Sequence, residues 1–247
     1  MTTFLYGIFP YICFALFVVG LLWRYRYDKF GWTTRSSQLY ESRLLRIGSP
    51  LFHFGLLIAL VGHVMGLIIP NTWTLAMGIS QEMYHLFAVS GGIVSGAMIV
   101  VGFTILVYRR RTVSTVFNAT TINDKVMYLV LGLTIVFGMW NTISTTIDHH
   151  YDYREGVSIW YRSLFALNPQ PELMGQAPIQ FQLHAIVASL LFAIWPFTRL
   201  VHVFSAPISY LNRPYIIYRS AGDARPVGTV SRAPRRTWDR PELTKRG

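Results

Sequence analysis

Four histidines inside long apolar runs are the residues of this chain best suited to chemistry. His53 and His63 lie ten positions apart within residues 52 to 66, whose other members are all apolar or glycine. His184 and His202 lie eighteen positions apart in the last apolar run. A lone histidine in such a run often bonds across a helix interface, whereas two pairs indicate ligands. Two neutral imidazoles can fill both axial positions of a haem iron.

Other redox or metal centres fit the residues less well. Zinc usually takes four ligands, and these histidine pairs have no nearby Cys, Asp or Glu to complete the set. The single cysteine, Cys13, excludes a cysteine-ligated iron–sulfur cluster and the CxxCH attachment of a c-type haem. A haem held by histidines is therefore the favoured cofactor.

Membrane-spanning helices are needed to position these histidines. Of the 247 residues, 52% are hydrophobic and only 13% are charged. A helix that crosses a hydrocarbon core of about 30 Å needs about 20 apolar residues. Five runs meet this requirement, at residues 4–23, 50–69, 84–108, 126–147 and 179–203. The sequence therefore predicts an all-α membrane protein with five transmembrane helices.

The basic residues predict how these helices are oriented. Of the 22 Lys and Arg residues, all but Arg154 and Arg162 lie in segments 24–46, 109–125 and 199–247. Basic loops favour the cytoplasmic side, so we expect the N-terminus outside and the C-terminus in the cytoplasm. The net charge of +11 indicates contact with a membrane surface rather than nucleic acid, because the basic segments alternate with apolar runs.

This orientation predicts which histidines meet. The second and last runs are antiparallel, so His63 pairs with His184 on the outer side and His53 with His202 on the inner side. Along straight helices the two spacings are roughly 15 Å and roughly 27 Å, so the pairs do not match in depth. Eighteen residues make five turns, so a continuous last helix presents both of its histidines on one face. Helix tilt or a kink at Pro196 is the expected remedy.

Three glycines and an arginine near the histidines fit a bound macrocycle. Gly55, Gly62 and Gly66 lie in the run that holds His53 and His63, and small residues let a flat ring approach the backbone. The GxxxG spacing of Gly62 and Gly66 equally fits ordinary helix packing. Arg199 lies one turn before His202, where its guanidinium can bind a haem propionate or reach a lipid phosphate.

Three segments carry a resemblance to a known family: "YRYDKFGWTTRSSQ", "LFHFGLLIALVGHVMGLIIP" and "QLHAIVASLLFAIWPFTRLVHVFSAPISYL". Over about residues 1–219 the chain resembles the cytochrome b subunit, or gamma chain, of the bacterial membrane-bound respiratory nitrate reductase. The resemblance implies a five-helix bundle with two b-type haems. It assigns His63 and His184 to the outer haem, and His53 and His202 to the inner haem.

The resemblance also implies an activity. Family members oxidise quinol near the outer haem and pass electrons through an iron–sulfur beta subunit to a molybdenum-containing alpha subunit, which reduces nitrate in the cytoplasm. This chain is then expected to be the quinol-oxidising subunit, in the bacterial cytoplasmic membrane. Some members have a lysine before the third span that is linked to quinol binding. Here that segment offers Glu82 and His85, and His85 is either the candidate proton acceptor or an interfacial histidine that contacts water or headgroups. Gly66 and His63 are expected to shape the quinol pocket.

The remaining polar segments receive simpler predictions. His149 and His150 lie in a predicted outer loop and are expected to be solvated, with proton release or metal capture as the alternative. Residues 220–247 are rich in Arg and Pro, and we expect a basic cytoplasmic tail that docks the partner subunits.

Two other functions are compatible with these residues. One is a di-haem membrane subunit that serves another iron–sulfur reductase, of the heterodisulfide or sulfur-pathway type. The other is a haem-free transporter or anchor whose histidines line a proton path. An absorption spectrum separates the second from a cytochrome, and the co-purifying subunits separate the first from a nitrate reductase.

Overall fold

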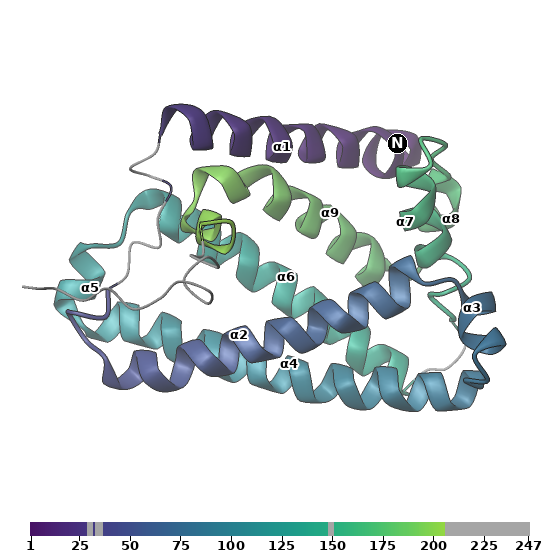
Figure 1. Cartoon of the computed structure of the whole chain (residues 1–247), viewed down its shortest axis with the longest axis horizontal. Coiled ribbons are helices and arrows are strands. Elements are labelled where there is room, and N and C mark those ends of the chain that lie inside the picture. The colour runs from purple at the N-terminus through teal and green to yellow at the C-terminus, as the bar shows by residue number, and fades with distance from the viewer. Residues whose placement is uncertain (29–31, 33–36, 148–150, 206–247) are drawn as a thin grey trace, which may run out of the picture. The chain divides into compact units, whose positions relative to one another are not determined.

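The structure is a computed structural model that describes residues 1–28, 32, 37–147 and 151–205 (Figure 1). Within these residues every regular element is a helix. All of the described helices belong to the compact unit Met1–Ala206. The predicted tail at 220–247, and its boundary at residue 219, lie outside the described residues.

Five helical segments are long and apolar enough to cross a membrane, and each overlaps one predicted run, which confirms the five predicted spans. The spans are Phe4–Tyr27, Arg43–Ile68, Gln81–Thr112, Ile122–Ile147 and Ile179–Phe197. The helices in chain order are η1 (Phe4–Ile8), α1 (Phe9–Tyr27), α2 (Arg43–His63), η2 (Val64–Ile68), α3 (Asn71–Ala76), α4 (Gln81–Thr112), α5 (Ser114–Asn118), α6 (Ile122–Ile147), α7 (Val157–Phe165), α8 (Pro171–Gly175), α9 (Ile179–Ile194), η3 (Trp195–Phe197) and η4 (Arg199–Val203).

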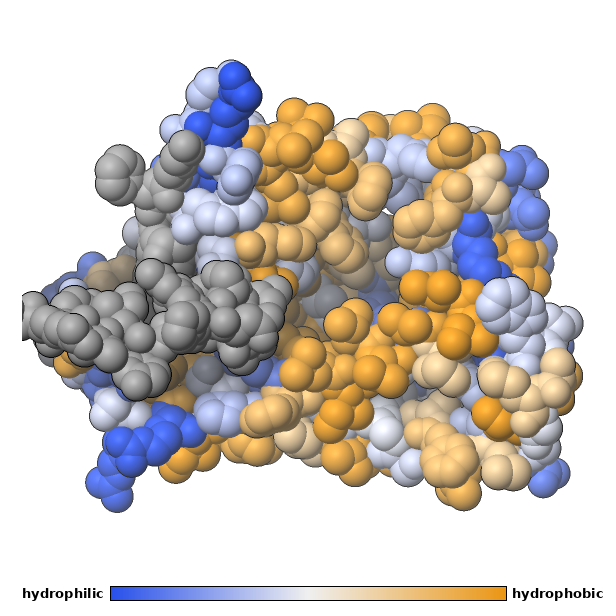
Figure 2. All heavy atoms as spheres, viewed as in Figure 1, coloured by the Kyte–Doolittle hydropathy of each residue, from blue (hydrophilic) through white to orange (hydrophobic). Residues whose placement is uncertain are grey.

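The outer surface of the spans is apolar. Figure 2 shows hydrophobic residues over the middle of the molecule and hydrophilic residues towards its two ends. Val19, Leu60 and Phe87 each expose more than half of their area. A continuous apolar surface of this extent suits hydrocarbon and not water. The described unit is therefore that of a multi-pass membrane protein.

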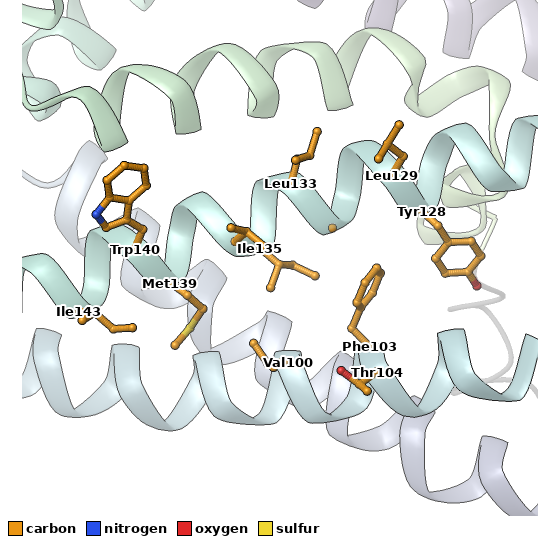
Figure 3. A pocket seen from close by; sticks show the side chains of 12 residues that line it. Val100, Phe103, Thr104, Tyr128, Leu129, Leu133, Ile135, Met139, Trp140 and Ile143 are labelled. Atoms are coloured by element: carbon orange, nitrogen blue, oxygen red, sulfur yellow. The ribbon is translucent and has the colours of Figure 1, made fainter. Parts of the chain in front are cut away.

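An apolar groove of about 610 Å³ lies between α4 and α6 (Figure 3). Val100 and Phe103 line it from α4, and Leu129, Val136 and Trp140 line it from α6. Several of these side chains are exposed, Leu129 to 64%. The groove is therefore part of the lipid-facing surface.

Glycines bring α2 and α4 close together. A Cβ on Gly102 would lie 2.5 Å from the backbone nitrogen of Phe52, and a Cβ on Gly55 would lie 2.9 Å from Ile99. Gly48 similarly accommodates Ile105. Because backbone cannot yield as a flexible side chain does, only glycine permits this approach. The close approach fixes α2, which carries two of the histidines, against α4.

The last span is broken around Pro196, where a kink is one of the two expected remedies for the unequal histidine spacings. The α-helix α9 ends at Ile194, and Thr198 is extended with φ −115° and ψ 178°. Pro196 has no N–H to donate, and in a continuing helix its ring would clash with the carbonyl group four residues earlier. Thr198 then caps the short η4, since its Oγ1 accepts from the Leu200 N–H at 3.3 Å. The 27 Å rise and the shared histidine face, which assumed a continuous helix, therefore do not apply to His184 in α9 and His202 in η4.

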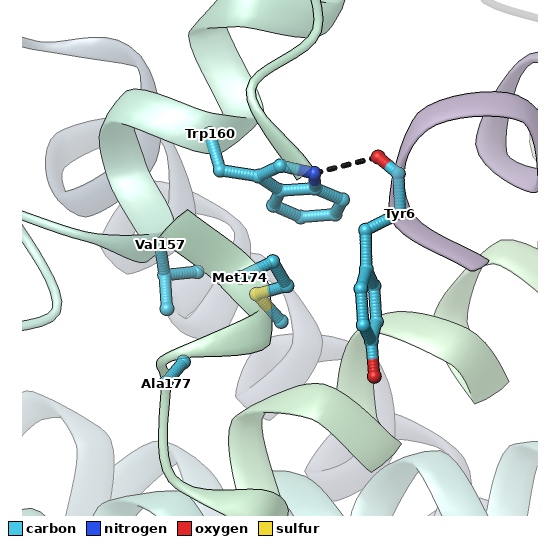
Figure 4. Close-up of a cluster of buried hydrophobic side chains, with 5 residues drawn as sticks. All are labelled: Tyr6, Val157, Trp160, Met174 and Ala177. Atoms are coloured by element: carbon cyan, nitrogen blue, oxygen red, sulfur yellow. Dashed lines mark hydrogen bonds between the residues drawn. The ribbon is translucent and has the colours of Figure 1, made fainter. Parts of the chain in front are cut away.

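A buried cluster ties the loop after α6 to the N-terminus (Figure 4). The cluster consists of Tyr6, Val157, Trp160, Met174 and Ala177. The indole N–H of Trp160 donates to the Tyr6 carbonyl at 2.8 Å, and the two rings meet edge to face. This packing holds α7 and α8 beside the start of the first span, and it orders the described loop that precedes α7.

Arg109, near the end of α4, organises the described part of the loop before α2. Its buried guanidinium donates to the Glu41 carboxylate, to Ser37 Oγ at 2.8 Å and to the carbonyls of both residues. Desolvation raises the pKa of Glu41, but hydrogen bonds from the Leu44 N–H and Arg109 outweigh it and hold this pKa below its usual value. The loop is therefore fixed by a buried charge network.

Candidate functional site

The structure brings the four histidines together as two pairs. The ring centroids of His63 in α2 and His184 in α9 are 6.3 Å apart, with the planes at 27°. Those of His53 in α2 and His202 in η4 are 6.0 Å apart, with the planes at 71°. We call the first the outer pair and the second the inner pair. The break in the last span brings His202 to its partner, and the combinations are those expected from the chain direction.

The ring separations fit two imidazoles on opposite sides of one metal ion. A bond from a transition metal to an imidazole nitrogen is about 2.0–2.1 Å long. Ring bonds of about 1.35 Å place that nitrogen roughly 1.15 Å from the ring centroid. Two ligands in line therefore have centroids about 6.3–6.5 Å apart. The observed 6.3 and 6.0 Å lie at or just below this range, so both pairs suit bis-histidine ligation of a haem iron.

Backbone carbonyls fix the orientation of three of the four imidazoles. A carbonyl oxygen only accepts, so each Nδ1 next to one carries the proton and leaves Nε2 as the ligand atom. The acceptors, each at 2.7 Å, are the carbonyls of Ser49 for His53, Ala59 for His63 and Arg199 for His202. Hydrogen bonds from the ring nitrogen that does not bind the metal typically orient metal-binding histidines in this way.

Gly138 of α6 makes room for the ring of His184. A Cβ at this position would lie 3.1 Å from His184 Cε1 and 3.6 Å from Nδ1. The sequence prediction missed Gly138, because the only signal was a glycine within a span and nothing in the sequence places it beside a histidine. The fourth imidazole is thus positioned by packing against α6.

An aromatic layer lies about one helical turn from the outer pair. Tyr153 stacks on Phe181 with centroids 6.3 Å apart, and its hydroxyl lies 3.2 Å from that of Tyr84. Burial and the Tyr84 hydroxyl raise the pKa of Tyr153, so it stays protonated. Phe181 and Gly66 are each three residues along the chain from an outer-pair histidine. The sequence prediction missed both tyrosines, since one lies in a loop and the other resembles any interfacial aromatic.

Gly62 and Gly66 have different surroundings, although they share a GxxxG spacing. A Cβ on Gly66 would lie 3.1 Å from the Tyr153 ring, whereas one on Gly62 would meet nothing within 4 Å. Gly66 belongs to η2, a π-helical segment of the kind that is frequent at functional sites. Helix packing therefore does not explain Gly62, and the role of Gly66 towards a cofactor stays a prediction.

Arg199 has a carboxylate partner within the chain. Its Nε and Nη2 donate to the two carboxylate oxygens of Asp124 at 2.6 and 2.7 Å, which ties η4 to the start of α6. Such two-point contacts match the geometry of guanidinium and carboxylate. Its predicted propionate contact is untested and stays a prediction.

The other predicted site residues lie outside the two imidazole pairs. Glu82 and His85 lie in the first turns of α4, whose N-terminus is capped by Ser80. Glu82 is exposed and His85 is half-buried, next to the buried Tyr84. The role of His85 in proton transfer stays a prediction. The segment 148–150, which holds the remaining two histidines, lies outside the described residues.

The chain matches known gamma chains over nearly its whole length. The family model described as nitrate reductase gamma subunit matches residues 2–221. The nitrate reductase gamma chain of Bacillus subtilis is 40% identical over 215 residues, which cover 87% of this chain and 96% of that protein. The respiratory nitrate reductase 2 gamma chain of Escherichia coli is 32% identical, with 89% and 97% covered.

A further relative is much longer than this chain. The nitrate reductase-like protein NarX of Mycobacterium tuberculosis is 55% identical over 231 residues. The match covers 93% of this chain but 35% of NarX. The similarity therefore concerns one part of NarX.

Proposed function

Because this chain belongs to the nitrate reductase gamma subunit family, we propose that it is the quinol-oxidising di-haem cytochrome b subunit of a respiratory nitrate reductase. It is a multi-pass protein of the bacterial inner membrane. In the proposal it takes electrons from quinol on the outer side and delivers them to a cytoplasmic iron–sulfur subunit. The observation that carries the proposal is the presence of two imidazole pairs at ligand spacing, 6.3 and 6.0 Å.

Each pair binds one haem in this proposal. A b-type haem, when bound, accepts and donates single electrons. His63 with His184 hold the outer haem, and His53 with His202 hold the inner haem. The carbonyl contacts of three imidazoles keep Nε2 available, which supports the assignment.

The different depths of the inner and outer imidazole pairs support electron transfer across the membrane. His53 and His63 are ten residues apart on one helix, which corresponds to roughly 15 Å along its axis. Since both sites have the same ligands, their potentials must be set by burial and by nearby charge. In the proposal Arg199, bound to Asp124, supplies part of that charge beside the inner pair.

Quinol oxidation requires a proton acceptor on the outer side, because two protons leave with the two electrons. The raised pKa of Tyr153 makes this phenol a hydrogen-bond partner and not a base. His85 is half-buried at the start of α4, and an imidazole is the side chain that most often transfers protons in catalysis. In the proposal it accepts the proton, while Gly66 and His63 border the quinol pocket.

A gamma chain associates with other nitrate reductase subunits. In the proposal these are an iron–sulfur beta subunit and a molybdenum-containing alpha subunit, which bind on the cytoplasmic side. The Arg109 network gives the loop before α2 a fixed conformation at that side, which supports its use as a docking surface. The tail at 220–247 is proposed as a second docking element.

Redox-titrated visible spectroscopy of the purified complex tests the proposal. We expect b-type bands that titrate as two components and that are reduced by added quinol. The haem content should be two per chain. A purified complex without a reducible b-type band contradicts the proposal.

A further inference from the structure

Arg154, in the loop before α7, is a buried cation beside the aromatic layer. It is only 4% exposed. Its guanidinium carbon lies 3.8 Å from the centroid of the Tyr84 ring, and Nη2 donates to Thr74 Oγ1 at 3.0 Å. Its Nε and Nη1 are buried and have no hydrogen-bond partner among the described residues. Two of its three nitrogens therefore hold unused donors.

The charge of Arg154 is also uncompensated within the described part of the chain. Asp152 accepts a hydrogen bond from the backbone N–H of Arg154 at 2.8 Å, but the guanidinium forms no ion pair among the described residues. A second cation is close, since burial and the charge of Arg154 both lower the pKa of Arg162. Burying an unpaired charge is strongly unfavourable. The surroundings of Arg154 are therefore those of an anion site.

The location of Arg154 identifies the anion. Tyr84 contacts both the guanidinium and the region of Gly66, because its ring lies against Arg154 and a Cβ on Gly66 would lie 3.3 Å from its hydroxyl. Gly66 follows His63 by three residues, about one helical turn. Arg154 is thus one aromatic ring and one turn away from the outer pair. The haem that this pair is proposed to hold carries carboxylates at its rim.

We propose that Arg154 binds a carboxylate of the outer haem through the donors that the protein leaves unused. The proposal rests on the function proposed above. A carboxylate compensates the buried charge, whereas a neutral quinol oxygen uses a donor and leaves the charge unpaired. Arg154 is therefore a positioning residue for the outer haem, and its positive charge favours the reduced state of that haem.

Arg162 offers a matched control. It is a neighbouring cation on α7, and its Nη1 donates to the Leu67 carbonyl at 3.1 Å and to Ser158 Oγ at 2.5 Å. Arg162→Gln removes a positive charge from the same region without removing the proposed carboxylate contact. Its effect on the outer haem therefore measures the loss of a nearby charge and of the Leu67 and Ser158 contacts, without loss of the proposed carboxylate contact.

The experiment is a spectropotentiometric titration of the complete complex in membranes, with Arg154→Gln compared with Arg162→Gln and the wild type. For Arg154→Gln we expect the redox equilibrium of the outer haem to shift about tenfold towards the oxidised form, a fall of about 59 mV for one electron. The inner haem should keep its potential, which shows that the fold is intact. For Arg162→Gln the shift should be clearly smaller.

Three results overturn the proposal. The first is an outer potential that changes no more in Arg154→Gln than in Arg162→Gln. The second is a changed KM for quinol with an unchanged outer potential, which makes quinol the ligand. If Arg154→Gln does not assemble, the wild-type chain is instead reconstituted with haem dimethyl ester, which lacks free carboxylates. The third refuting result is an outer-haem potential that this replacement leaves unaltered. Absence of b-type bands in the wild type instead contradicts the proposed function.

Discussion

Replacing Gly138 by alanine tests whether α6 determines the position of the His184 imidazole. The new Cβ would lie 3.1 Å from His184 Cε1. Because ordinary Cβ contacts begin at 3.4 Å, the ring must move by a few tenths of an ångström unless α6 shifts. Ligand distances in metal sites are defined to about 0.2 Å. The required displacement therefore exceeds what an axial ligand tolerates.

We expect Gly138→Ala to weaken binding of the outer haem selectively. Changes next to a metal ligand typically reduce affinity about 10–100-fold. Gly132→Ala is the matched control on the same helix, because its Cβ would meet Phe103 at 3.4 Å, an ordinary contact. Both changes improve helix propensity by about 1 kcal/mol. Any difference between the two variants therefore comes from the His184 contact.

The assay is the haem-to-chain ratio of the purified complex, together with a redox titration that resolves the two haems. Gly138→Ala should lose outer haem and keep inner haem, while Gly132→Ala should keep both. Full occupancy of both sites in Gly138→Ala, with the wild-type outer potential, refutes the reasoning. It would mean that the position of His184 does not depend on α6.

Three further outcomes are expected. His63→Ala and His184→Ala should each remove the same spectral component, and loss of different components would disprove the pairing. Gly102→Ala should destabilise the chain in detergent by about 1–3 kcal/mol, because its Cβ would overlap the backbone of α2. Gly91→Ala on the same helix should not, because nothing lies within 4 Å of its Cβ. Equal denaturation midpoints for the two variants would count against the close packing of α2 and α4. Because the pKa of Glu41 is lowered on folding, its stabilisation should be complete above about pH 4.3 and lost as the pH falls through the folded pKa. Thermal melts against pH should therefore show a steeper acid loss for wild type than for Glu41→Gln, and parallel curves would contradict this.

The sequence was sufficient for the spans and for the choice of histidines. Apolar run length is a local property, and lipid forces each run to satisfy its own backbone hydrogen bonds, so five helices follow directly. The antiparallel direction of the second and last runs is set by counting spans. It restricts which imidazoles can meet, and the rings are in fact 6.3 and 6.0 Å apart in those combinations.

The sequence was insufficient where tertiary contacts decide. Pro196 indicated a kink, but the extended Thr198 and the short helix that restarts after it depend on local hydrogen bonding that hydropathy does not register. Gly138 and Tyr153 act only through neighbours that are distant in the chain. Arg154 belongs to a loop between two spans, where a basic residue predicts solvent exposure, yet the fold buries it against Tyr84.

Each imidazole pair takes one member from α2 and the other from the end of the chain, at α9 or η4. Under the proposed function, neither haem site can exist on a nascent chain until the ribosome has completed the last span and the translocon has released it beside the second. Haem loading is then a late step of biogenesis, and a fragment that stops after α6 should be inserted yet colourless.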